Sequence, residues 1–346
     1  MKKYFVIVVL AGICWSCKKN NPSGEPPPAS GYVKVTVAAT ETGFIYLDGS
    51  YTGIRSPNTI EVPKGNHVIG VALQSSFQYL KKEVNLTANA TVNLTAADKP
   101  APKVWKALWI GLHETTGSAA TGDCSTRFSK ADLDAGFDFY KWSISQHFEK
   151  YSYGTMQWET ERRDISVPVR LKKGSNTWFT VEPDSITKLL PDIRPGAYDC
   201  IFVFWRESEG NCSFTSNYFG LAWTNPMNET IKTGFVTIKF NAGTNINDRI
   251  NYYKTTDPGV WLHEWLHTTG EYFYQAKGKK MPQKAGDGLV VHAAELYGYN
   301  FPWMNWYLDF ISGRVPGLQT GSGYLGIGPE TFLKCTVRET AVNNCP

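Results

Sequence analysis

Two histidines and a glutamate lie close together in the last third of this 346-residue chain, in the segment His263-Glu264-Trp265-Leu266-His267. On a helix, a spacing of four residues puts both imidazoles on one face, where they can bind one metal ion, and leaves Glu264 beside that ion. A hydrolytic zinc keeps three protein ligands and one open position, where the pKa of water falls to about 7. Glu264 is then the candidate general base, which takes a proton from the water and passes it to a leaving amine.

The flanking residues predict one short helix over residues 257–270. Asp257 is a suitable N-cap, Pro258 suits the first helical position, and Gly270 suits the left-handed residue after a last turn. The residues between them are largely apolar, namely Val260, Trp261, Leu262, Trp265 and Leu266. This composition is typical of a helix inside a domain, so we expect the metal to lie in a site of low dielectric constant.

A third ligand has to come from another part of the chain. Residues 287–299 predict a second helix, entered from a Gly-containing loop, on which His292 and Glu295 share a face. Either side chain could complete the site. Imidazole is a common zinc ligand, so we favour His292, with Glu295 either orienting it or facing solvent. Glu271 is a weaker choice, because three ligands from one short helix converge poorly, and we expect it to be a solvated carboxylate.

Two tyrosines, Tyr297 and Tyr299, follow these ligand candidates. A hydroxyl near the metal could stabilise the oxyanion of a transition state, so both are candidates for that role. The chain has 18 Tyr, 18 Phe and 12 Trp residues, which indicates that most of its rings serve packing. We therefore interpret the aromatic run at 303–310 as a core helix that closes the domain, in preference to part of a binding cleft.

The motif at 263–267 resembles the zincin metallopeptidases, and Gly270 falls where the metzincin branch has its glycine. Phe273 stands where that branch has its third histidine, so the resemblance stops short of the metzincins. A glutamate ligand on the second helix would resemble the gluzincin branch, which usually has an aspartate four residues later, where this chain has Tyr299. The resemblance implies a zinc-dependent peptidase that hydrolyses peptide bonds of proteins or peptides.

Residues 105–346 suffice for one sizeable α+β domain of this zincin-like kind. Apolar runs and periodic patterns predict its strands at 107–112, 165–169, 200–205, 219–223 and 235–240, and its helices at 129–151 and 184–193. The resemblance implies that 219–223 is an edge strand that pairs with the substrate backbone. His113 and Glu114 repeat the first two letters of the zinc motif, but Gly117 replaces the second histidine and the composition predicts a loop up to Gly122.

The chain begins with the features of an exported protein. Met1-Lys2-Lys3 precede an apolar run, residues 4–13, that is too short to span a bilayer and is typical of a secretory signal peptide. Ser16-Cys17 resembles a bacterial lipobox, which implies a signal peptide over residues 1–17 and a lipidated Cys17; cleavage before Cys14 and secretion without a lipid are the alternatives. Proline-rich residues 18–30 predict a semi-stiff tether. We expect a lipid-anchored protein of the bacterial cell envelope, on the outer membrane and either periplasmic or surface-exposed.

Residues 31–96 predict a small all-β domain, with strands at 32–37, 44–47, 59–62, 67–71 and 90–94 and with turn residues between them. The frame Ile45-Tyr46-Leu47-Asp48-Gly49, Gly53, Ser56-Pro57 and Val62-Pro63-Lys64-Gly65 resembles a PEGA domain, with Pro63-Lys64-Gly65-Asn66 in place of the name-giving motif. This resemblance implies a β-sandwich, which we interpret as a spacer or adhesion module without chemistry of its own. Residues 97–104, with two prolines, predict a linker.

Cysteine content and charge exclude several classes of function. Once Cys14 is removed and Cys17 is lipidated, five cysteines remain, which fits an oxidising compartment; we predict the pairs Cys200–Cys212 and Cys335–Cys345 and a free Cys124. No cysteine lies in a recognisable nucleophile context, so we do not expect a cysteine protease. The formal net charge of +4 is unclustered, so nucleic-acid binding has no support.

Two functions fit these patterns. The leading hypothesis is a zinc-dependent metallopeptidase, with Zn²⁺ held by His263, His267 and either His292 or Glu295. The alternative is a non-catalytic surface-binding lipoprotein that engages a glycan or a host protein and has a structural or vestigial metal site. Glu264 favours the first, since a purely structural site needs no base there. Cleavage specificity and oligomeric state are left open by the sequence.

Overall fold

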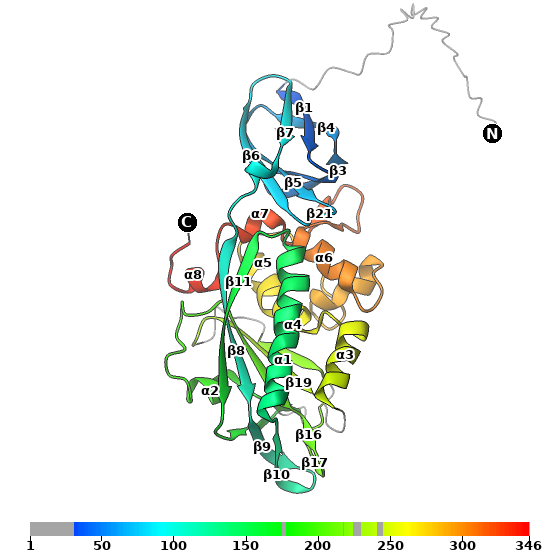
Figure 1. Cartoon of the computed structure of the whole chain (residues 1–346). Coiled ribbons are helices and arrows are strands. Elements are labelled where there is room, and N and C mark those ends of the chain that lie inside the picture. Colours follow the sequence, from blue (N-terminus) through cyan, green and yellow to red (C-terminus); the bar gives the residue numbers. More distant parts are fainter. Residues whose placement is uncertain (1–30, 175–177, 217, 224–229, 241–244, 346) are drawn as a thin grey trace, which may run out of the picture.

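The computed structural model describes residues 31–174, 178–216, 218–223, 230–240 and 245–345 (Figure 1). The predicted signal peptide over residues 1–17, the lipidation site Cys17 and the tether 18–30 lie outside the described residues. In Figure 1 an N-terminal module (residues 31–99) stacks on one end of a larger C-terminal domain (residues 100–345).

The N-terminal module consists of two antiparallel or mixed sheets packed face to face. The first has the order β4-β1-β7 and is built from β1 (Tyr32–Ala39), β4 (Asn58–Pro63) and β7 (Ala90–Leu94). The second has the order β3-β2-β5-β6 and is built from β2 (Gly43–Leu47), β3 (Ser50–Ser56), β5 (Gly65–Leu73) and β6 (Tyr79–Leu86). Side chains from both sheets, such as Val35 and Ile69, meet in one core. The predicted β-sandwich is therefore present, with β3 and β6 as strands that the sequence pattern missed.

A five-stranded sheet of order β11-β8-β15-β19-β18 is the centre of the C-terminal domain. Its strands are β8 (Lys103–Leu112), β11 (Met156–Ile165), β15 (Cys200–Arg206), β18 (Gly220–Trp223) and β19 (Gly234–Phe240). Neighbouring strands run parallel, except that β18 pairs antiparallel with β19 at the edge. Residues of β15 and β19 are almost all buried, because both faces of the sheet are covered.

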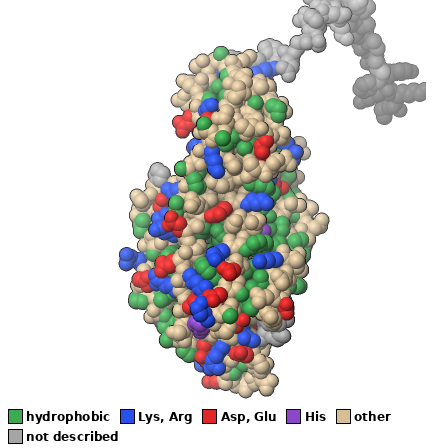
Figure 2. All heavy atoms as spheres, in the orientation of Figure 1, with side chains coloured by type: hydrophobic (Ala, Val, Ile, Leu, Met, Phe, Trp, Pro, Cys, Tyr) green, Lys and Arg blue, Asp and Glu red, His purple; other side chains and the backbone are tan. Residues whose placement is uncertain are grey.

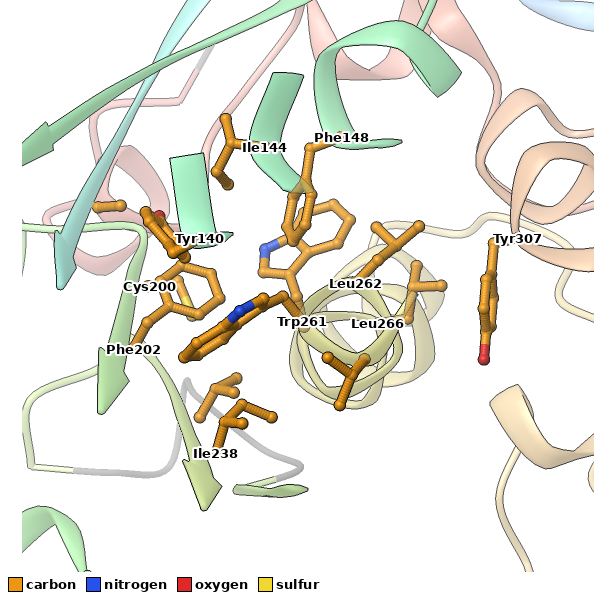
Figure 3. Close-up of a cluster of buried hydrophobic side chains, with 14 of the residues drawn as sticks. Tyr140, Ile144, Phe148, Cys200, Phe202, Ile238, Trp261, Leu262, Leu266 and Tyr307 are labelled. Atoms are coloured by element: carbon orange, nitrogen blue, oxygen red, sulfur yellow. The ribbon is translucent and has the colours of Figure 1, made fainter. Parts of the chain in front are cut away.

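Helices cover one face of this sheet. α1 (Lys130–Ser143), continued by a π-helical turn (Ile144–Glu149), and α4 (Val260–Thr268) lie against the sheet. α3 (Ile246–Thr256) packs on α1, and α6 (Met304–Ser312) contributes to the same core. Figure 3 shows α4 end-on, with Trp261 directed toward Tyr140 and Phe202, and with Leu262 and Leu266 on the side of Tyr307. Because Trp261, Leu262 and Leu266 are fully buried, α4 is fixed in position by packing on several sides.

Short elements connect this framework. They are β9 (Glu114–Ala119), β10 (Gly122–Arg127), β12 (Val169–Arg170), β13 (Lys172–Lys173), β14 (Phe179–Thr180), α2 (Pro183–Thr187), β16 (Ser208–Glu209), β17 (Cys212–Ser213), α5 (Tyr274–Ala276), β20 (Val315–Pro316), β21 (Tyr324–Leu325), α7 (Pro329–Phe332) and α8 (Val337–Ala341), with 3-10 helices at Ala96–Asp98 and Val291–Tyr297 and a second π-helical turn at Thr269–Phe273.

Several helices and strands predicted for this domain are present, but their boundaries differ from the predicted ones. Ser129 caps α1 as predicted, through a capping box with Asp132. The strand predicted at 165–169 is instead the end of β11 and the start of β12, with Pro168 between them, since proline cannot donate to a ladder. The helix predicted at 184–193 ends at Thr187, ahead of the helix-breaking Pro191. The predicted loop at 113–122 is largely a hairpin of β9 and β10, because its threonines favour extended structure.

The two helices predicted around the metal motif also have different limits. Asp257 ends α3, and Gly259 is the N-cap of α4. Gly270 does not stop the helix, which continues through the π-helical turn to Ala276. A Cβ at Gly270 would lie 3.1 Å from Leu266 and 3.3 Å from Phe310, so this glycine serves close packing. The segment predicted as a helix over 287–299 contains only the 3-10 helix Val291–Tyr297, which ends at Gly298 with φ 81°.

The disulfide prediction is half right. Cys335 pairs with Cys345, as predicted. Cys212 pairs with Cys124, 88 residues away, and Cys200 is the free thiol. Cys200 is fully buried at the start of the central strand β15, where burial raises the pKa of its thiol well above the usual value. The Cys124–Cys212 bond ties the β9–β10 hairpin to the β16–β17 hairpin.

A sealed junction joins the N-terminal module to the C-terminal domain. We use this name for Tyr46, Tyr79 and Tyr153, all at most 2% exposed, and for the groups around them. The Tyr46 hydroxyl donates to the backbone oxygen of Ser312 at the end of α6, at 2.7 Å. The Arg314 guanidinium lies 3.7 Å from the centre of the Phe44 ring. The module is therefore packed onto the domain rather than suspended from it.

The described part of the chain has no helix with the length and apolar character needed to cross a membrane. On the face shown in Figure 2, Lys and Arg side chains alternate with Asp and Glu side chains. That distribution fits the small net charge and offers no basic stripe on this face for a nucleic acid.

Candidate metal centre

Three histidines converge at the C-terminal domain. His263 and His267 come from successive turns of α4, and His292 comes from the second residue of the 3-10 helix that follows. The Nε2 atom of His263 lies 3.1 Å from Nε2 of His267 and 3.2 Å from Nε2 of His292. The structure therefore brings together the pair expected from the motif and the third ligand that the sequence favoured.

Each imidazole also has an oxygen partner at its second ring nitrogen, Nδ1. Nδ1 of His263 lies 2.9 Å from the Tyr307 hydroxyl, and Nδ1 of His267 lies 3.2 Å from the Glu271 carboxylate. Nδ1 of His292 lies 2.5 Å from the Asp287 carboxylate. Three Nδ1 atoms with oxygen partners keep the three Nε2 atoms free to face one point.

This arrangement fits a tetrahedral zinc ion. Zn–N bonds of about 2.0–2.1 Å at tetrahedral angles put neighbouring ligand nitrogens about 3.3 Å apart. The separations of 3.1 and 3.2 Å around His263 are close to that value. An ion bound at Nε2 also leaves the proton on Nδ1, where the tyrosine and the two carboxylates can accept it. Burial and the two neighbouring imidazoles lower the pKa of His263 well below its usual value, so it is neutral and able to bind a metal.

Glu264 lies in the cavity beside the histidines and is 7% exposed. Burial raises its pKa to about 8, and the neighbouring Asp257 and Glu271 carboxylates act in the same direction. Burial likewise raises the pKa of Asp257, which lines the same cavity, to about 6. A divalent cation at the three imidazoles opposes these shifts, because a nearby positive charge favours the ionised carboxylate.

Gly220, the first residue of β18, makes room for that carboxylate. A Cβ on Gly220 would lie 2.5 Å from Cγ of Glu264 and 2.6 Å from its Oε1. No side chain larger than hydrogen fits there without moving Glu264 or the edge strand. The candidate base and the edge of the sheet are thus in direct contact.

An open cavity of about 590 Å³ leads to this centre. Aromatic rings from several segments line it, namely Trp178, Tyr218, Phe219, Tyr252, Tyr253, Phe301, Trp303 and Tyr307. The other lining residues include Gly220, Leu221 and Ala222 of the edge strand β18. The prediction of an edge strand at 219–223 is confirmed in its position, and the aromatic run at 303–310 contributes to both a core helix and the cavity wall.

Three other sequence candidates lie apart from the histidines. Glu295 is exposed and is absent from the histidine cluster. The Tyr297 hydroxyl accepts a hydrogen bond from the backbone N–H of Gln283, and the Tyr299 hydroxyl donates to Asp309. Both rings pack on Trp306, and neither lines the cavity.

The structure gives Glu271 and Trp303 places at the site that the sequence analysis did not assign to them. Glu271 is 3% exposed and accepts from the backbone N–H of Val291 as well as contacting His267, so the prediction of a solvated carboxylate is wrong. Trp303 has a left-handed backbone, with φ 57°, and its ring lies 5.9 Å from that of His263. A bulky residue held at positive φ is a recurring feature of functional sites. The one sequence signal for these roles was the position of Glu271, four residues after His267 and therefore on the same helix face.

Comparison with known proteins bears on the N-terminal module. The family model described as the PEGA domain matches residues 33–99. The predicted PEGA-like module over residues 31–96 is therefore confirmed. A search of curated proteins found no match to the chain.

Proposed function

We propose that this protein is a zinc-dependent metallopeptidase whose C-terminal domain is zincin-like. The observation that supports the proposal best is the convergence of three Nε2 atoms, with separations of 3.1 and 3.2 Å, in a cavity that also contains the Glu264 carboxylate. A structural metal site needs neither an open cavity nor a carboxylate that is not a ligand. Both are present here.

The residues of the chain have distinct roles in this proposal. His263, His267 and His292 hold the ion, and Tyr307, Glu271 and Asp287 fix the direction of their Nε2 atoms. A zinc ion held this way acts as a Lewis acid and lowers the pKa of water to about 7. Glu264 accepts the proton of the attacking water on its carboxylate and delivers it to the nitrogen of the leaving amine.

The edge strand gives a reason to propose a peptide as the substrate. The backbone oxygen of Phe219 accepts from the N–H of Lys239, so this residue faces β19. In an antiparallel pair the direction alternates, so the backbone groups of Gly220 and Ala222 face away from the sheet. Ala222 is half-buried and lines the cavity. An extended peptide can pair with such an edge, and its scissile bond would then pass Glu264, which touches Gly220.

We place this activity at the bacterial cell envelope, with the chain anchored by lipid at Cys17. The signal peptide and lipobox resemblance support the anchor. The Cys124–Cys212 and Cys335–Cys345 disulfides support an oxidising compartment. The alternative, a non-catalytic binding protein with a vestigial metal site, leaves the position of Glu264 unexplained.

The test begins with metal content. Mass spectrometry of the purified protein should find about one zinc per chain in the wild type and in Glu295→Ala, and a large loss in His263→Ala and His292→Ala. Glu264→Gln should keep the zinc and lose hydrolysis of a mixed peptide library. Zinc that persists in both histidine variants would exclude this centre, and equal inertness of the wild type and Glu264→Gln would favour the binding protein.

A further inference from the structure

Three exposed rings stand around the metal centre. Phe219, Tyr252 and Phe301 are 54%, 45% and 57% exposed, and all three line the cavity. They are three of the ten large apolar side chains that are exposed in the described part of the chain. A concentration of exposed apolar groups at one cavity is typical of a ligand-binding surface.

Neighbouring groups pack against each of these rings. The Phe219 ring meets the Tyr253 ring at 6.2 Å, and the Arg249 guanidinium lies 4.7 Å from the Tyr252 ring. The Phe301 ring meets the Trp303 ring edge-on at 6.1 Å. Since Trp303 packs against His263, the apolar wall continues down to the proposed metal ligands.

The charges in the cavity all have one sign. Asp257, Glu264 and Asp287 line it, and no Lys or Arg does among the described residues. An acidic side chain entering this cavity would lose water and meet three carboxylates, while the nearby Arg249 guanidinium is stacked on the lining rings Tyr252 and Tyr253. A neutral ring would instead bury apolar area against other rings. The three histidines that would hold the cation also line this cavity, so the ion would lie next to these carboxylates.

We propose that this cavity is a substrate subsite that selects peptides with an aromatic or other large apolar side chain next to the cleaved bond. The inference rests on the proposed function and names its substrate class. A cavity of about 590 Å³ is large enough for one such side chain together with the backbone on either side. Among the described strands, β18 pairs only with β19. Its outer edge favours a peptide over a glycan, because a glycan has no backbone amides to pair with it.

Binding of two small hydroxamates tests the subsite without requiring turnover. The probes are N-acetyl-phenylalanine hydroxamate and N-acetyl-glutamate α-hydroxamate, which share the zinc-binding group and differ in the side chain. Calorimetry on the zinc-loaded full chain should give an affinity on the order of tenfold higher for the phenylalanine probe. Phe301→Ala and Tyr252→Ala should each reduce that preference at least about threefold.

Leu296→Ala is the matched control, since Leu296 is 48% exposed just before Phe301 in the chain and does not line the cavity. It should leave the preference unchanged. Equal affinity of the two probes, or a preference that survives both aromatic substitutions, would overturn the subsite while leaving the zinc centre intact. Retention of the protein on cell-wall glycan that depends on Phe301, together with equal probe affinities, would assign the rings to a glycan. Absence of zinc from the wild type would instead remove the proposed function.

Discussion

Two of the regions where aromatic rings gather, the sealed junction and the cavity, differ in what covers the rings. At the sealed junction, Tyr46, Tyr79 and Tyr153 are at most 2% exposed, and their neighbours come from both parts of the chain. Around the cavity, Phe219 and Phe301 are more than half exposed. At the junction, aromatic side chains bury apolar surface between two folded parts of the chain. At the cavity, the same residue types leave apolar surface exposed, where a binding partner could cover it.

The difference teaches that ring content alone does not indicate function. At the junction two of the three hydroxyls are hydrogen-bonded: the Tyr46 hydroxyl donates to Ser312, and the Tyr153 hydroxyl accepts from Arg314 at 2.8 Å. The exposed phenylalanines have no polar group to satisfy. What they lack is apolar contact, and a substrate side chain would supply it.

Truncation of one ring in each region should separate the two most clearly. Tyr46→Ala removes a fully buried ring and should lower the free energy of unfolding by about 3–5 kcal/mol. Phe301→Ala removes a ring that is more than half exposed and should change it by less than about 0.5 kcal/mol. Urea denaturation of the zinc-loaded protein measures both. Similar losses in the two variants would mean that the cavity rings are structural.

A substitution beside Glu264 should affect hydrolysis strongly, because this part of the cavity is tightly packed. Gly220→Ala puts a methyl group within 2.6 Å of Glu264, so peptide hydrolysis should fall on the order of a hundredfold while the zinc content stays the same. Gly286→Ala is the matched control, because a Cβ there meets nothing within 4 Å and its φ is not positive. Unchanged hydrolysis in Gly220→Ala would show that the edge strand yields without moving the base.

Two glutamates near the motif should respond differently to the same substitution. Glu271→Gln weakens the support of His267 and should raise the zinc dissociation constant about 10- to 100-fold. Glu295→Gln changes an exposed side chain and should leave the zinc dissociation constant unchanged. Competition with a chromophoric chelator gives both constants. The opposite result would make Glu295 the functional carboxylate, as the sequence had left open.

The smallest expected effect concerns one hydrogen bond at the junction. Tyr46→Phe keeps the ring and removes the bond to Ser312, so it should lower the free energy of unfolding by about 1 kcal/mol. The difference in the free energy of unfolding between this variant and Tyr46→Ala gives the contribution of the buried ring. If Tyr46→Phe costs as much as Tyr46→Ala, the junction depends on the hydroxyl rather than on buried area.

The sequence predicted which side chains lie together better than it predicted the contacts around them. His263, Glu264, His267 and His292 were identifiable because their residue types and spacing follow a metal-binding pattern. Gly270 was misjudged as a helix stop because the close approach of Phe310, 40 residues later, was not visible in a local pattern.

Long-range contacts explain the other errors. Tyr297 and Tyr299 were chosen as oxyanion-stabilising candidates for their nearness in sequence to the ligand candidates. The turn after Tyr299 instead brings α6 back, so that Tyr307, which the sequence had not singled out, reaches His263. Cys212 was paired with its near neighbour Cys200, whereas the hairpins bring it to Cys124. In each case the deciding contact depends on how separate segments pack, which periodicity does not encode.

Helix α6 belongs to both regions at once. Tyr307 contacts the imidazole of His263, a proposed zinc ligand, while Leu308 and Ser312 of the same helix face the PEGA module. Any free energy that an ordered α6 adds to zinc binding must therefore equal what bound zinc adds to the docking of the module, because the four states form a thermodynamic cycle. If zinc binds as proposed, its removal should therefore loosen the attachment of the N-terminal module, although none of the three clustered histidines belongs to that module.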